Sequence, residues 1–418
     1  MSKIVDKFIS DYNSETDIKK RFRSLIEFVN VYYDSDFLKV NALLEKELEL
    51  CLRENLVNGE AMIRFMLGYS AFEQGNLQKG NEEVDKVMAI FDRVTSHEVR
   101  AQVLNFLAYM NSHQGNFEKA FQHIYECIRE AELAEDKKNQ FWGVYTLGVF
   151  HFDLKDYANS QKCFSEAIAG FTKNDNPYGI ARSETGLSSV YIQLEKFKEA
   201  EKLLQRSLAY YKEIEALSGQ SRSLNDLAVI FSKTNQLEKA LDCFKQALKI
   251  RKETNHAQGI ATSLNEIAEV LLTLKKFDET EKYLLEAKLA CERVNNRSKL
   301  YRTHFLFSQL YRNINQPWKA LEHYEKYDEL KTEVQGQTAN NKIKELQTKM
   351  ATEKADKEKE IERLKNVELK SAYDIIADKN KEILDSIHYA KRIQQSLLPT
   401  EIYIERNLKR LLKKQSTS

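Results

Sequence analysis

Asparagine and arginine side chains recur along this chain at a spacing of 40 residues, where they could hold a peptide. Asn225 and Asn265 stand in nearly identical settings, Ser-Leu-Asn-Asp-Leu-Ala and Ser-Leu-Asn-Glu-Ile-Ala. A side-chain amide both donates and accepts hydrogen bonds, so a ladder of amides is suited to holding the backbone of an extended peptide. Three residues ahead of this column stand Arg182, Arg222 and Arg302, whose guanidinium groups are suited to pairing with an acidic residue or a terminal carboxylate.

These residues predict a binding groove between residues 102 and 312. The column expected to point into it reads Phe65, Asn105, Tyr145, Thr185, Asn225, Asn265 and Phe305. We predict that a peptide or protein segment contacts Asn105, Tyr145, Arg182, Arg222, Asn225, Asn265 and Arg302. The alternative is that these are ordinary polar groups that face water in a groove.

No residue pattern predicts catalysis, a metal site or a cofactor. The phosphate-cradling, nucleophile-elbow and zinc-peptidase patterns do not occur, and His123 and His151 fall on predicted repeat helices, where structural roles are expected. His388 would be the candidate phospho-acceptor of a histidine kinase, but Tyr389 follows it in place of an acidic residue. We therefore expect a chain that is not an enzyme and needs no cofactor.

The five cysteines are an odd number without a CxxC pair: Cys51, Cys127, Cys163, Cys243 and Cys291. Cys163 and Cys243 share one repeat position two units apart, so they are predicted to lie far from each other. Buried free thiols in a reducing cytoplasm are the expected state.

A 40-residue repeat must position these side chains. Small residues recur at this spacing: Gly80, Ala120, Ser160, Ala200, Ala240, Thr280 and Ala320. Thirteen residues before each of them stands a large apolar residue: Leu67, Leu107, Leu147, Leu187, Leu227, Ile267 and Phe307. A fixed period between about 20 and 50 residues is typical of a repeat array, in which each unit buries its apolar face on its neighbours.

Within one unit, apolar positions three and four apart indicate helices, and turn sequences such as Gln74-Gly75-Asn76 separate them. The small residues let two helices approach closely. We expect an all-α solenoid of about seven 40-residue helical hairpins over residues 61–335. A degenerate repeat over residues 1–60 is expected to form a helical cap, because Glu27 occupies a position of the large apolar column.

These columns resemble the tetratricopeptide repeat. The resemblance is carried by residues such as Leu147-Gly148, Tyr157, Phe164 and Ala167 in one unit, and it extends over about residues 61–335. Its usual period is about 34 residues, so the hairpins here resemble longer-helix members such as kinesin light chain and the LGN-type scaffolds. The resemblance implies a superhelix whose first helices line a concave face, and similar asparagines hold peptides in the kinesin light chain type.

Composition excludes several other classes. A formal net charge of +1 gives no overall attraction to nucleic acid or to an acidic membrane. No stretch of about 20 apolar residues occurs, and Met1–Thr16 lacks the features of a secretion signal. The expectation is a cytoplasmic protein that binds neither nucleic acid nor membrane.

The composition changes near residue 336. Lys342–Lys370 is charge-rich with sparse apolar residues, which predicts a long exposed helix that pairs with a second copy; a single solvated helix is the alternative. Beyond it, the residues expected to form a dimer seam are Ile376, Ile383, Ile387, Ala390 and Leu397. We assign residues 336–398 to a coiled-coil signalling helix, residues 399–418 to a tail, and predict a homodimer.

The stretch before Pro399 resembles the helical linker that enters the catalytic domain of stage II sporulation E (SpoIIE) type serine/threonine phosphatases. Ser386-Ile387, Tyr389–Gln394 and Leu397-Leu398-Pro399 carry this resemblance. The family's domain binds two metal ions through acidic residues, notably in a Gly-Asp pair, and this chain contains no Gly-Asp. The resemblance implies a sensor that regulates such a phosphatase, with the catalytic domain expected to be absent. A histidine kinase sensor and a pure assembly scaffold remain the rivals.

Overall fold

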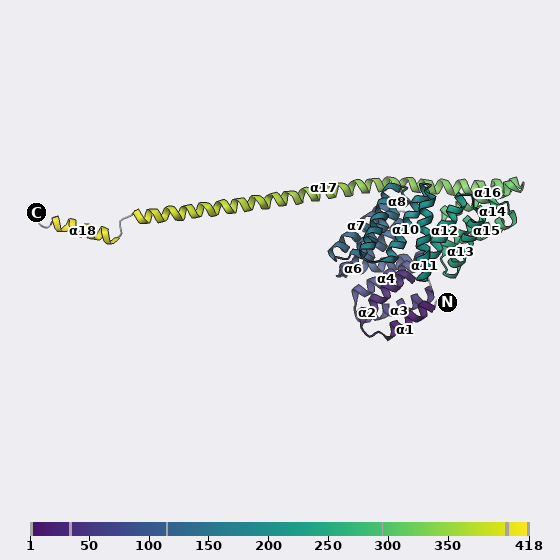
Figure 1. The fold of residues 1–418 in the computed structure, drawn as a ribbon, viewed down its shortest axis with the longest axis horizontal. Coiled ribbons are helices and arrows are strands. Elements are labelled where there is room, and N and C mark those ends of the chain that lie inside the picture. Colours follow the sequence, from purple (N-terminus) through teal and green to yellow (C-terminus); the bar gives the residue numbers. More distant parts are fainter. Residues whose placement is uncertain (1–2, 33–35, 114–115, 295, 398–400, 416–418) are drawn as a thin grey trace. The chain divides into compact units, whose positions relative to one another are not determined.

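Helices follow one another along the chain, and most of those between Phe37 and Asn313 have 17 residues (Figure 1). The computed structural model describes residues 3–32, 36–113, 116–294, 296–397 and 401–415. The N-terminal helices are α1 (Lys3–Ser14), α2 (Ile18–Tyr32) and α3 (Phe37–Arg53). The array follows as α4 (Val57–Glu73), α5 (Leu77–Ile90), the short 3-10 helix η1 (Phe91–Arg93), α6 (His97–His113), α7 (Phe117–Leu133), α8 (Lys137–Asp153), α9 (Tyr157–Lys173), α10 (Pro177–Gln193), α11 (Phe197–Glu213), α12 (Leu217–Lys233), α13 (Leu237–Glu253), α14 (Ala257–Thr273), α15 (Phe277–Arg293) and α16 (Arg297–Asn313). The chain ends with α17 (Pro317–Leu397) and α18 (Glu401–Gln415).

Most of the short linkers that the structure describes share one conformation. Lys155, between α8 and α9, has a φ of 60°, and left-handed residues recur at intervals of 20 residues or multiples of it. The N–H of Asp156 donates to the carbonyl of His151 over 2.8 Å, and the Asp156 carboxylate accepts from the N–H of Asn159 over 3.2 Å. This linker therefore ends one helix and caps the next, which produces the regular hairpins.

The columns of small and large residues meet between paired helices. Ala120, Ala200 and Ala240 are fully buried. Phe164 and Phe244, which share a repeat position four residues after the small column, are also buried, and Phe244 lies in one core cluster with Ala240. A Cβ added to Gly148 would lie 3.1 Å from the Phe164 ring, so no larger residue fits there without displacing that ring. The predicted all-α solenoid of helical hairpins is confirmed.

The N-terminal part, for which we expected a helical cap with a degenerate repeat, contains the three helices α1, α2 and α3. Val5, Leu25 and Leu44, one from each helix, form a core with Met62 of α4. The Tyr32 hydroxyl donates to the carbonyl of Ile214 over 2.8 Å, 182 residues further on. The superhelical path thus returns the N-terminal helices to the end of α11.

Helix α17 is continuous from the last hairpin into the segment that we assigned to signalling. The contacts within the chain divide it into two compact units, Met1–Leu346 and Gln347–Ser418. The boundary between these units falls inside α17. None of the described helices is both long enough and apolar enough to cross a membrane.

A pair of histidines joins α16 to the start of α17. His304 Nδ1 lies 2.9 Å from His323 Nδ1, and the ring of Phe307 stacks on His323 with centroids 4.5 Å apart. Burial lowers the pKa of His304 to about 4 and also lowers the pKa of His323, and Lys326 and Lys288 act in the same direction on both. The contact therefore holds two neutral imidazoles.

We expect a fall from about pH 7 to about pH 5 to reduce the free energy of unfolding through His304 by about 1–2 kcal/mol. The unfolded histidine, with a pKa of about 6.5, takes up a proton in this range that the folded one does not, so stability decreases as pH falls. Urea unfolding at the two pH values measures the change. His304→Phe should lose this part of the pH dependence, and His388→Phe, on the exposed part of α17, should keep it. If the wild type and both variants lose the same stability between the two pH values, His304 is not the cause of the pH dependence.

Candidate peptide-binding groove

The first helices of successive hairpins form one wall. Helices α4, α6, α8, α10 and α12 each pack on the next, and α14 packs on α16. Positions that recur at 40 residues therefore line up across this wall. Two such positions carry Arg182 on α10 and Arg222 on α12.

Arg182 and Arg222 are the cations at the centre of this wall. The Arg182 guanidinium lies over the ring of Tyr145, 5.6 Å from its centroid. Trp142 meets the same tyrosine edge-on at 5.5 Å. The guanidinium of Arg222 is exposed and lies within electrostatic reach of Arg182. Among the described residues, neither arginine has a carboxylate at ion-pair distance. The structure thus brings together the predicted Tyr145, Arg182 and Arg222.

Two tyrosines from the start of the array complete the groove, and we did not predict them. Tyr69 on α4 and Tyr109 on α6 have ring centroids 5.7 Å apart, and both lie within electrostatic reach of Arg222 on α12. They occupy the repeat position of Ser189, seven residues after the arginine column. Their 40-residue spacing was a usable signal, but only the superhelical turn places α4 opposite α12.

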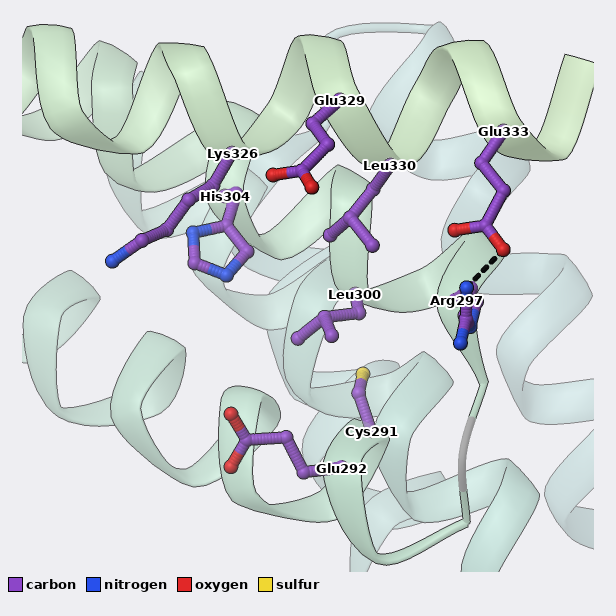
Figure 2. Close-up of a pocket in the computed structure, with 9 residues that line it drawn as sticks. All are labelled: Cys291, Glu292, Arg297, Leu300, His304, Lys326, Glu329, Leu330 and Glu333. Carbon is purple, nitrogen blue, oxygen red and sulfur yellow. Dashed lines mark hydrogen bonds and ion pairs between the residues drawn. The ribbon is translucent and has the colours of Figure 1, made fainter.

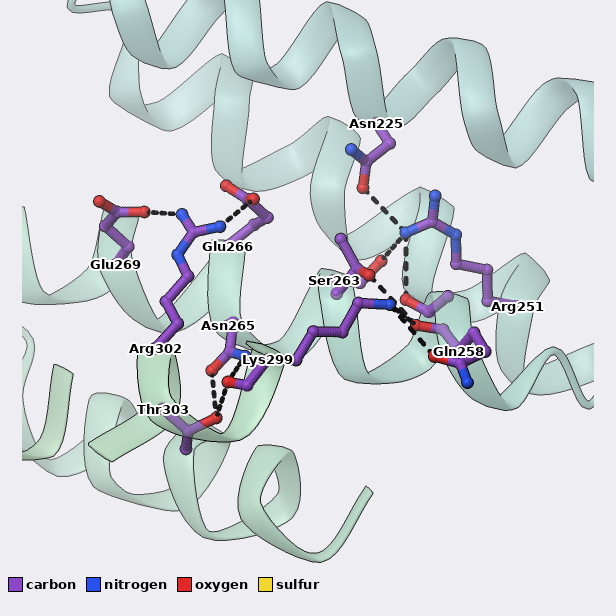
Figure 3. A network of polar contacts seen from close by, with 12 residues as sticks. Asn225, Arg251, Gln258, Ser263, Asn265, Glu266, Glu269, Lys299, Arg302 and Thr303 are labelled. Atoms are coloured by element: carbon purple, nitrogen blue, oxygen red, sulfur yellow. Dashed lines mark hydrogen bonds and ion pairs between the residues drawn. The ribbon is translucent and has the colours of Figure 1, made fainter. Parts of the chain in front are cut away.

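Asn225 does not present its amide to the groove. Its side chain is buried, and its Oδ1 accepts from Arg251 Nη1 over 2.8 Å (Figure 3). The same Nη1 also donates to Ser263 Oγ over 2.7 Å and to the carbonyl of Gly259 over 3.1 Å. Asn225 therefore binds Arg251 of α13, the second helix of its hairpin, and does not contribute to an amide ladder for a peptide.

Asn265 is likewise used inside the array. It is 1% exposed, its Nδ2 donates to the carbonyl of Lys299 over 3.2 Å, and its Oδ1 accepts from Thr303 over 2.9 Å. The column two positions before the large apolar one faces the neighbouring hairpin in both cases. The expected amide ladder is corrected accordingly, because these two amides are already bonded within the array.

Arg302 and Asn105 also stand apart from the central pair. Arg302 bridges Glu266, at 2.8 Å, and Glu269 on α14, so its charge is neutralised within the array (Figure 3). Asn105 is half-buried on α6, and among the described residues its Oδ1 has no hydrogen-bond donor. The groove that the geometry supports is therefore lined by fewer of the predicted residues.

A polar contact closes the superhelix beside the groove. His256 Nε2, at the start of α14, lies 3.0 Å from Glu73 Oε2 on α4. The Tyr109 hydroxyl donates to the other oxygen of this carboxylate over 2.9 Å. Helices far apart in sequence thus meet on the inner face beside Tyr109, which lies within electrostatic reach of Arg222.

Residues of α15, α16 and the first part of α17 line a cavity of about 440 Å³ (Figure 2). Leu300 and Leu330 face each other across it, and Arg297 bonds Glu333 at one side. Both carboxylates and cations line this cavity, so its charges have partners of opposite sign nearby. We interpret it as a gap in the packing between the last hairpin and α17.

The predicted dimer residues lie on α17. Ile376, Ile383, Ile387 and Ala390 are exposed, the three isoleucines by 55–56%. The side chain of Leu397 lies outside the described residues. The exposed apolar stripe is compatible with a second helix, and the structure contains one chain only.

The described residues contain no group of three or more potential metal ligands. All five cysteines are free, and burial raises the pKa of Cys51 and of Cys127 to about 12. Such thiols stay protonated and unreactive at neutral pH.

Family models described as tetratricopeptide repeat match residues 143–213, 221–255 and 259–332. No curated protein sequence matches the chain. Among solved structures, a Rap protein complexed with Competence and Sporulation Factor matches with a TM-score of 0.56 at 12% identity, over 80% of this chain and 99% of that one. NprR in complex with its cognate peptide NprX matches with a TM-score of 0.53 at 15% identity, over 74% of this chain and 89% of that one. At these identities the likeness shows the fold.

Proposed function

We propose that this chain, which carries tetratricopeptide repeats in a solenoid, is a non-catalytic sensor that binds a peptide or protein segment against its inner face. The observation that carries the proposal is the central pair Arg182 and Arg222. Both cations lie among tyrosines, and among the described residues neither has a carboxylate partner at ion-pair distance. Polar side chains that a fold leaves without partners on an enclosed inner surface are available to a ligand.

The structural relatives support this choice of ligand. The Rap protein was solved with Competence and Sporulation Factor and NprR with its cognate peptide. Both share the fold of this chain, and a curved array of first helices offers an extended segment many contacts at once. We carry peptide binding over to this chain as part of the proposal.

We propose that the chain regulates a SpoIIE-type serine phosphatase in bacterial signal transduction. This regulation takes place in the cytoplasm and acts through a dimer formed by α17. Tyr373, Ile376, Asn380, Ile383, Ile387 and Ala390 alternate at steps of three and four residues, which is the spacing of a coiled-coil seam. Asn380 is a polar residue within this seam, of the kind that favours two strands in one register. Filling the groove would change the geometry of this helix pair.

A steric block tests peptide binding without changing charge. Ser189 lies on the groove face of α10, where its Oγ bonds Asp226 Oδ2 over 3.2 Å. We expect Ser189→Trp to weaken binding of octapeptides selected on the wild-type chain from a random phage library by at least about tenfold. Fluorescence anisotropy with the synthetic peptides measures this change.

Ser165→Trp is the matched control, because Ser165 is exposed on the second helix α9. Peptides that bind the wild type and Ser165→Trp equally, and Ser189→Trp weakly, support the groove. If no selected peptide distinguishes the two tryptophan variants, peptide binding on the inner face is excluded.

A further inference from the structure

We infer that the segment bound in the groove carries an anionic group, a carboxylate or a phosphate monoester, that lies between Arg182 and Arg222. The inference rests on the proposed function and adds the chemical class of the ligand. A guanidinium presents a planar fork of donors that matches both of these oxyanions.

The first support is the unneutralised charge of the central pair. Arg182 and Arg222 lie on adjacent first helices and repel each other. The π face of Tyr145 attracts the Arg182 cation without cancelling its charge. Two like charges on adjacent helices repel each other, and an anion bound between them would remove this repulsion.

A second layer of cations lies behind this pair. Arg251 is 7% exposed, makes its hydrogen bonds only to neutral oxygens among the described residues, and has a buried Nε without an acceptor. Lys299 Nζ donates to the carbonyl of Gln258 over 2.9 Å and likewise has no carboxylate at ion-pair distance within the described part of the chain (Figure 3). Burial lowers the pKa of Arg251 to about 10 and that of Lys299 to about 8, and the neighbouring cations Arg222 and Arg251, respectively, act in the same direction.

The nearby carboxylates do not balance these charges. Glu73 is bonded to Tyr109 and His256, and Glu266 is held by Arg302. Asp226 lies within electrostatic reach of Arg222 and Arg251, but its carboxylate accepts hydrogen bonds from Ser189 and Asn225, and burial raises its pKa. Within the described part of the chain, Arg182, Arg222, Arg251 and Lys299 therefore keep no carboxylate at ion-pair distance.

Phenol groups surround the proposed anion site. Tyr69, Tyr109 and Tyr145 lie within electrostatic reach of Arg222, and Tyr178 and Tyr211 lie within that of Arg182. Tyrosines limit the access of water, which strengthens a charge-assisted hydrogen bond in the site. They also provide apolar ring surface for the rest of a peptide.

The test uses four labelled octapeptides that differ only in their anions. The neutral probe is acetyl-(Ser-Gln)4-amide. The others replace glutamine with glutamate, leave the C-terminal carboxylate free, or phosphorylate one central serine. We expect at least one anionic probe to bind at least about tenfold more tightly than the neutral probe, with an affinity that falls as salt rises. The three anionic probes distinguish an acidic side chain, a chain terminus and a phosphate.

Arg182→Gln and Arg222→Gln should each remove this preference, and Arg293→Gln, on the exposed end of α15, should keep it. Arg222→Gln should leave the melting temperature unchanged or raise it, because it removes a repulsion; a folding defect would lower it. Equal binding of all four probes, binding of none, or a preference that survives both glutamine variants would overturn the inference. If octapeptides blocked by Ser189→Trp are found and are neutral, the groove stands and only the anion site fails.

Discussion

Replacing Phe164 with alanine is expected to lower the free energy of unfolding by about 3–5 kcal/mol. Phe164 is 2% exposed and lies at the centre of the array, where its ring packs on Tyr145 with centroids 5.6 Å apart. The backbones of Gly148 and Gly186 approach the same ring so closely that an added Cβ would lie 3.1 Å and 2.6 Å from it. Three helices therefore meet around this one side chain, and they have little freedom to collapse into the cavity that alanine would leave.

The effect should extend to neighbouring hairpins, because each repeat is stabilised mainly by its contacts with the next. Urea unfolding followed by circular dichroism measures the loss. Leu289→Ala is the matched control, since Leu289 is 68% exposed on α15 and should change stability by less than about 0.5 kcal/mol. A similar result for the two variants would show that the ring of Phe164 is not the centre of this core.

Placing lysine at both Ile383 and Ile387 is expected to convert the proposed dimer into a monomer, with a weakening of at least about a hundredfold. Both isoleucines are exposed in the single chain, and pairing with a second copy would bury them at successive seam positions. Four ammonium groups would then have to lose their water at one interface. Light scattering coupled to size-exclusion chromatography gives the mass of each variant.

Asp385→Lys introduces the same side chain on the opposite face of the helix and should leave the dimer intact. The wild-type chain should run at twice its 48.8 kDa mass. A monomeric wild type would remove both the dimer and the signalling route that depends on it, whereas a double variant that stays dimeric would move the interface away from Ile383 and Ile387.

Much of the array could be predicted because its rules are local and repeated. A small residue every 40 positions, as at Ala120 and Ala240, lets two helices pack closely. The linker position that Lys155 occupies, with a φ of 60°, recurs along the array and ends a helix each time. Seven units with the same pattern reinforced one another. The three helices α1 to α3 could not be placed from the repeat alone: α3 begins 40 residues before α5, but α1 and α2 precede that register and share a core with α3 and α4.

The candidate site was predicted only in part, for a reason visible at Asn225. Sequence spacing places Asn225 and Arg222 on one helix three residues apart, a separation of most of one turn. Which of the two faces the interior depends on the second helix behind them, and Arg251 of α13 occupies the amide of Asn225. The exposed Arg222 remained for the groove.

The sequence by itself determined the repeat, the helical hairpins and the positions that could line a concave wall, because these follow from periodic side-chain size and from turn chemistry. Only the tertiary structure decided which polar groups are already bonded and which are not. It brought Tyr69 and Tyr109 within electrostatic reach of Arg222, although both tyrosines precede that arginine by more than a hundred residues. The physical reason is that the superhelical turn is the sum of small rotations between many hairpins, and no single 40-residue unit encodes the contact that closes it.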